Sequence, residues 1–124
     1  MTTPGRIASQ AGDLIRQFNH ETISTGDGWQ YPPHAYDAIG SLAYLVRMLP
    51  QALEQSVHPV MHTHECGRVA IDGGGDPDEA VKHMRTALAN AKAAAGLLSA
   101  AVGHLHAATS PMGLDTRGLP GFED

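Results

Sequence analysis

The residues most capable of chemistry lie close together between His58 and Cys66. This stretch contains three histidines, His58, His62 and His64, together with Glu65 and the single cysteine of the chain. Imidazole and thiolate groups are the usual ligands of zinc, which requires about four donors around one point. A metal site is therefore the first hypothesis, and the backbone conformation of residues 58–66 decides which side chains could form it.

Helical and extended backbones would bring different side chains together. In an extended segment, His62, His64 and Cys66 alternate onto one face. In a helix, His58, His62 and Cys66 follow one another at intervals of four residues, while His64 turns to the apolar face. We favour the helix, which leaves the other three facing solvent without a fourth protein ligand. No physiological metal site is then expected, and a metal-binding or metal-sensing function of this cluster is the alternative.

No group of residues indicates an enzyme. Cys66 beside a histidine resembles a thiolate–imidazole pair, but no signature or oxyanion-forming turn accompanies it. The acidic residues at 76–79 are explained by capping of a following helix. The three glycines at 73–75 lack the Gly-Lys-Ser/Thr ending of a phosphate-binding loop and predict a linker. We predict no catalytic, cofactor-binding or metal-ligating residue and no cofactor.

Charge and composition argue against nucleic acid and membrane partners. The net charge is −5, with 13 acidic and 8 basic residues, and the basic residues do not cluster. No segment is apolar enough to span a bilayer, and residues 1–13 lack a signal-type apolar core. A single cysteine fits a reducing compartment. We expect a cytoplasmic protein, and the Ala, Gly, His and Arg usage suggests a bacterial one.

Residues 4–21 are predicted to form the first helix, followed by a loop at 22–33. The apolar residues of the helix share one face and are Ile7, Ala11, Leu14, Ile15 and Phe18. The loop contains two glycines and Pro32–Pro33, which favour turns over helix. Trp29 and Tyr31 are its only aromatic residues. We expect them to fold back over the end of the core, and contact with a ligand or partner is the alternative.

Residues 34–49 are predicted to form a second helix that is kinked and then continues through 51–66. Its apolar stripe is wide enough to need more than one neighbour. Pro50 produces the kink, and Pro59 makes a break at His58 the alternative to a continuous helix. A small-molecule pocket between helices near Tyr36 and Tyr44 is a further hypothesis.

The clearest pattern runs through residues 77–108, where apolar residues alternate spacings of three and four. Asp76 is expected to cap this helix, and Pro77 suits its first position. The spacing is that of a heptad seam, in which the a and d positions face a neighbouring helix. The seam comprises Val81, Met84, Leu88, Ala91, Ala95, Leu98, Val102 and Leu105. The g positions beside it are Ala80, Ala87, Ala94 and Ala101. A stripe of this width can pack against two neighbours at once.

These elements predict an all-α, antiparallel bundle of three to four helices. We expect one domain at residues 1–109, with the earlier helices packed against the Ala-rich last one, and a flexible tail at residues 110–124. The last helix is longer than the first can cover, which favours a homodimer with the Ala-lined edge of the last helix as interface. The expected function is protein–protein interaction. A further partner could bind the Trp29–Tyr31 loop or the tail, and a small-molecule-binding bundle is another alternative.

Overall fold

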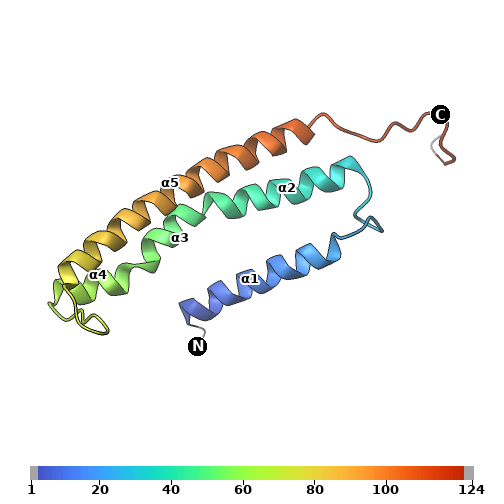
Figure 1. Cartoon of the computed structure of the whole chain (residues 1–124). Coiled ribbons are helices and arrows are strands. Elements are labelled where there is room, and N and C mark those ends of the chain that lie inside the picture. Colours follow the sequence, from blue (N-terminus) through green and yellow to red (C-terminus); the bar gives the residue numbers. More distant parts are fainter. Residues whose placement is uncertain (1–2, 122–124) are drawn as a thin grey trace.

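The computed structural model describes residues 3–121, which form an all-α fold (Figure 1). The helices are α1 (Pro4–Glu21), α2 (Pro32–Arg47), α3 (Leu49–Ser56), α4 (His58–Glu65) and α5 (Pro77–Thr109). The predicted fold class, with a bent middle element and a long C-terminal helix, is confirmed. No helix among residues 3–121 is both long and apolar enough to cross a bilayer.

The helix α5 runs antiparallel to the three helices that precede it. α2 and α3 pack along it, and α4 lies against its N-terminal end (Figure 1). The buried apolar side chains of the described residues are Val46 from α2 with Val81 and Ala95 from α5. The core is therefore a thin seam between α5 and the α2–α4 segment.

Two prolines bend the segment that follows α2. Pro50 is the second residue of α3, and Pro59 is the second residue of α4. A proline at such a position removes no hydrogen bond from its own helix but prevents continuation of the preceding one. The predicted kink at Pro50 is confirmed, and the break at His58, given as an alternative, also occurs. The two bends let short helices follow α5 along its length.

The predicted seam of α5 is correct from Val81 to Ala95 and at Val102, but wrong at Leu98 and Leu105. Val81 and Ala95 are buried, but Leu98 and Leu105 are 48% and 53% exposed. Their places toward the neighbouring helices are taken by Ser99 and His106, which are partly buried. A straight helix has about 3.6 residues per turn, so a strict seven-residue repeat drifts away from a fixed neighbour. Over a helix of 33 residues the drift moves the seam by one position.

His106 is seated on α2 by an aromatic residue and a glycine. Its ring stacks on Tyr36, with centroids 4.2 Å apart. A Cβ atom added at Gly40 would lie 2.8 Å from His106 Nε2, closer than ordinary packing allows. The absence of a side chain at Gly40 therefore makes room for the imidazole that holds the C-terminal half of α5 against α2.

The position of α1 differs from expectation. It was predicted to pack against the last helix, but it packs against none of the other described helices and lies apart from them (Figure 1). Thr3 caps it as predicted, accepting a hydrogen bond from the Arg6 backbone N–H at 3.3 Å. Phe18 of this helix contacts Trp29 of the following loop. The sequence pattern correctly predicted the helix but not its packing partner.

Beyond α5, residues 110–121 form turns and irregular chain. This agrees with the predicted helix end near residue 109, and residues 122–124 of the predicted tail lie outside the described residues. Asp115 and Arg117 form a local ion pair with a closest distance of 2.6 Å. The guanidinium of Arg117 lowers the pKa of Asp115, and the carboxylate in turn raises the pKa of Arg117.

The Gly40–His106 contact predicts opposite effects of alanine at two helical glycines. Gly96 lies in α5 with open space around its Cβ position, so Gly96→Ala should stabilise the protein by up to about 1 kcal/mol through helix propensity. Gly40→Ala should fail to stabilise, because the new methyl group displaces His106. In a His106→Ala background, Gly40→Ala should become stabilising. Urea unfolding measures all four variants, and equal stabilisation by the two glycine substitutions in the native background would contradict the contact.

Candidate functional site

The histidine stretch is helical, and this separates its possible metal ligands. α4 begins at His58, ends at Glu65 and is followed by Cys66 as the capping residue. The extended arrangement that would unite His62, His64 and Cys66 is therefore absent. Among residues 3–121, no three His, Cys, Asp or Glu side chains come together in a way that could hold a metal ion.

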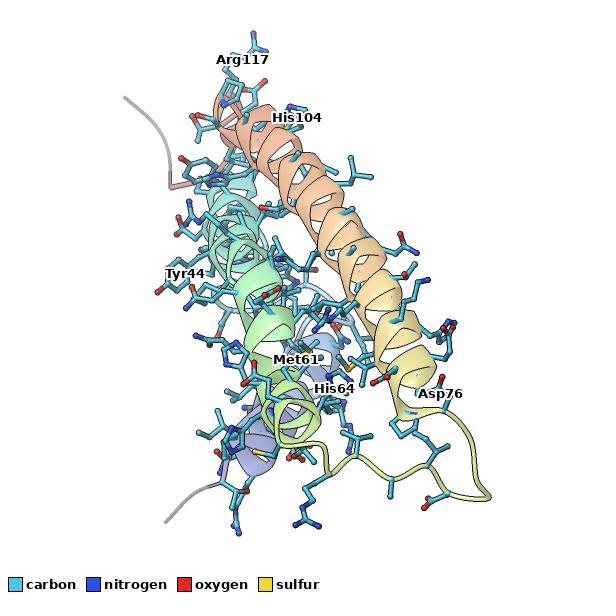
Figure 2. The ribbon with its side chains drawn as sticks, turned by 90° about the vertical axis from the view of Figure 1, so that its left-hand side faces the viewer. Tyr44, Met61, His64, Asp76, His104 and Arg117 are labelled. Carbon is cyan, nitrogen blue, oxygen red and sulfur yellow. The ribbon has the colours of Figure 1, made fainter. Side chains whose placement is uncertain are left out.

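His64 faces the start of α5, whereas the favoured helical conformation was predicted to turn it to the apolar face. Its Nε2 atom lies 2.8 Å from Asp78 Oδ1, and its side chain is 27% exposed (Figure 2). His58, His62 and Cys66 are exposed, which agrees with the predicted helical conformation. Asp76 receives the backbone N–H of Asp78 at 3.0 Å and caps α5. His64 thus links α4 to the capped end of α5 and does not lie with the other histidines.

A second polar contact joins α3 to the middle of α5. Lys92 Nζ donates to Glu54 Oε2 at 2.7 Å, and both side chains are substantially exposed. The hydrogen bond and positive charge of Lys92 lower the pKa of Glu54 below its ordinary value of 4.5, with a smaller contribution from His58. Because the folded-state pKa is lowered, this contact stabilises the fold above the ordinary titration range and is lost as the pH falls through the lowered value.

The aromatic loop covers the end of α1 and forms a shallow pocket. Trp29 meets Phe18 edge-on, with ring centroids 6.0 Å apart, and pairs with Gly26 through backbone hydrogen bonds. Trp29 therefore folds back as predicted, but onto α1 and not onto the seam beside α5, whereas Tyr31 is exposed. A pocket of about 320 Å³ lies here, lined by Thr25, Trp29, Gln30, Tyr31, Pro32, His34 and Ala35.

Tyr36 and Tyr44, proposed to line a pocket between helices, have different surroundings. Tyr36 is stacked on His106, as described above. Tyr44 is exposed and points away from α5 (Figure 2), with the Arg47 guanidinium 5.7 Å from the centroid of its ring. The pocket at the aromatic loop includes neither of these two rings.

One candidate surface is an exposed apolar stripe on the C-terminal half of α5. Its large side chains are Leu97, Leu98 and Leu105, of which Leu97 is 75% exposed. Ala101 lies between Leu98 and Leu105, Ala94 lies one turn before them, and both alanines are exposed. From position 93 to position 109 the helix contains no Asp, Glu, Lys or Arg. A surface helix normally carries charged residues on its solvent face, so this stripe is typical of a helix that binds a partner. We call it the α5 stripe.

A second exposed apolar stripe follows α1. Ile7 is 56% exposed and Leu14 is 65% exposed, while Ala11 between them is exposed as well. Ile15 and Phe18 widen the stripe and are partly covered. An isolated helix of 18 residues is marginal in water, because helices in proteins are stabilised chiefly by packing of their apolar face. We call this surface the α1 stripe.

The total accessible area shows how much surface the chain leaves uncovered. The single chain exposes 9617 Å². A globular monomer of 13.1 kDa exposes about 6,400 Å². The excess is about 3,200 Å² per chain by that scaling, which exceeds the area that each partner buries in an obligate homodimer interface, about 1,000–2,500 Å². The two apolar stripes belong to this excess.

No protein-family model, curated protein or solved structure matches the chain. The candidate surface is therefore assigned from its own residues. The sequence prediction placed an interface on the Ala-lined edge of the last helix, and Ala94 and Ala101 of that edge are exposed. It placed Leu98 and Leu105 in the internal seam, however, and missed the α1 stripe as an uncovered surface. The lack of charge at positions 93–109 is the sequence signal that would have identified the α5 stripe as exposed.

The separation of the histidines predicts that zinc does not stabilise the fold. A metal bound to the native state would raise the thermal unfolding midpoint in a concentration-dependent way. Untagged protein should unfold at the same temperature with and without one equivalent of zinc, and His62→Ala should behave identically. A zinc-dependent rise that disappears in His62→Ala would contradict the geometry of α4.

The Lys92–Glu54 contact predicts a residue-specific titration. Lys92→Gln should return the Glu54 pKa toward 4.5, because glutamine removes the positive charge and the ammonium donor that stabilise the Glu54 carboxylate. Lys82→Gln, which also removes one exposed cation from α5, should leave the Glu54 titration unchanged. NMR titration of the Glu54 carboxyl carbon measures both. Equal shifts in the two variants would mean that net charge, and not this contact, sets the value.

Proposed function

We propose that this protein acts by protein–protein interaction as a homodimer whose interface includes the α5 stripe. The observation that supports the proposal is the exposure of Leu97, Leu98 and Leu105 on a helical segment without a charged residue. Burying a fully exposed side chain of this size contributes about 1.5–3 kcal/mol, and Leu98 and Leu105, about half exposed, would each contribute roughly half of that. A dimer would cover them without requiring any change in the α2–α5 seam.

The small residues of the stripe favour a helical partner. Ala94 and Ala101 have side chains short enough for a second helix to approach closely, and the leucines beside them would fill the remaining space. Such an interface resembles the interior of a helical bundle. The proposed role is that of a dimeric scaffold, in a bacterial cytoplasm, with no catalytic centre.

A second contact for another protein is proposed at the aromatic loop. Trp29 and Tyr31 line the pocket of about 320 Å³, and Tyr31 is exposed. Aromatic residues at a shallow pocket are common anchors in protein interfaces. The irregular chain at residues 110–121 is a further proposed contact segment. Both would leave the α5 stripe free for dimerisation.

A charge placed in the α5 stripe should separate the proposed dimer. Leu98→Glu would bury a carboxylate without a partner at both copies of the site, each costing about 3 kcal/mol or more, and would raise the dimer Kd by well over a hundredfold. Ala100→Glu is the matched control, because Ala100 is exposed on the other side of the same turn. Size-exclusion chromatography with light scattering should show a dimer for the native chain and Ala100→Glu, and a monomer for Leu98→Glu. Equal masses for the two variants would overturn the proposed interface.

A further inference from the structure

The spacing of the side chains on the α5 stripe indicates which segment of a second copy covers it, an inference that rests on the proposed dimer. The two uncovered stripes have the same internal spacing. On α1, the two large exposed side chains are Ile7 and Leu14, seven residues apart. On α5, Leu98 and Leu105 are also seven residues apart. Seven residues of helix extend about 10.5 Å, so both pairs of side chains can meet simultaneously when the helices lie side by side.

The small residues between the large ones decide the direction of pairing. Ala11 lies four residues after Ile7 and three before Leu14. Ala101 lies three residues after Leu98 and four before Leu105. When the helices run antiparallel, Ile7 meets Leu105, Leu14 meets Leu98, and the two alanines meet between them. When they run parallel, Ala11 meets Val102, which is already partly buried on the other side of the stripe.

The antiparallel register extends beyond these three pairs toward the C-terminal end of α1. There it places Phe18, the largest apolar residue of α1, opposite the small side chain of Ala94. Leu97, the most exposed leucine of α5, lies to one side of this central row and widens the apolar surface that the partner helix covers. The central row of the contact contains no charged side chain on either helix.

This direction cannot be satisfied within one chain. α1 and α5 of a single molecule run in the same direction, because α2, α3 and α4 together form the return path between them (Figure 1). An antiparallel partner for the α5 stripe must therefore come from another molecule. The separation of α1 from the rest of its own chain leaves it available for this contact.

We propose that α1 of one copy packs antiparallel on the α5 stripe of a second copy, and that the two copies exchange this helix reciprocally. Such an exchange is isologous, so each copy donates one α1 and receives one. Each α5 then has two helical neighbours, its own α2–α4 segment and the partner's α1. The arrangement covers both stripes with a single symmetric interface and completes the bundle that one chain leaves open.

Disulfide cross-linking between single-cysteine copies tests the register. In a Cys66→Ser background, a tagged Leu14→Cys chain and an untagged Leu98→Cys chain are mixed, allowed to exchange and oxidised. A covalent heterodimer is expected, and Ile7→Cys with Leu105→Cys should give another. The matched control combines Leu14→Cys with Leu105→Cys, which the register separates by about 10.5 Å, beyond the reach of a disulfide. Circular dichroism confirms that each variant remains helical.

The other products separate failure of this inference from failure of the proposed dimer. A Leu98→Cys homodimer without the heterodimer would mean that two α5 stripes meet directly, which overturns the helix exchange and leaves the proposed function intact. A dimer by light scattering that forms neither matched cross-link would also overturn the exchange. A monomer in which the Leu14→Cys, Leu98→Cys double variant forms an internal disulfide would overturn both proposals.

Discussion

The packing of α5 against the bent α2–α4 segment is the interaction on which the rest of the structure depends. α5 is one unbroken helix of 33 residues, and the chain supplies only one row of short helices to lie against it. Val46, Val81 and Ala95 are the buried apolar residues of this seam within the described chain. A helix packed on one side only leaves its remaining apolar surface in water, and here that surface includes three leucines. The uncovered stripe is thus a direct consequence of the arrangement of the helices.

Polar and aromatic contacts fix the two ends of this seam. At one end, His64 of α4 meets Asp78 beside the cap of α5, at 2.8 Å. At the other, His106 stacks on Tyr36 in the space left by Gly40. These contacts give two histidines structural roles, which is why a histidine-rich sequence does not need to contain a metal site. They also orient α5 so that Ser99 and His106, and not Leu98 and Leu105, face α2.

Most of the secondary structure could be predicted from local patterns, whereas the packing of α1 could not. Prolines at the first turns, the Asp76 cap and the apolar periodicity depend on neighbouring residues, so the sequence alone identified the helices. The exposure of Leu98 and Leu105 depends on the drift between a seven-residue repeat and a straight helix, and on the fit of His106 against Gly40. The separation of α1 depends on contacts that the chain does not make, and an amphipathic pattern does not say which molecule supplies the partner.

In the proposed dimer, a second copy covers the apolar stripes on α1 and α5 that a single chain leaves exposed. Sedimentation equilibrium of the unmodified protein over a range of concentrations tests this proposal most directly. The account predicts a mass of twice 13.1 kDa that falls toward the monomer value only on dilution. A mass of 13.1 kDa at every concentration, with α1 and the C-terminal half of α5 still helical, would contradict it.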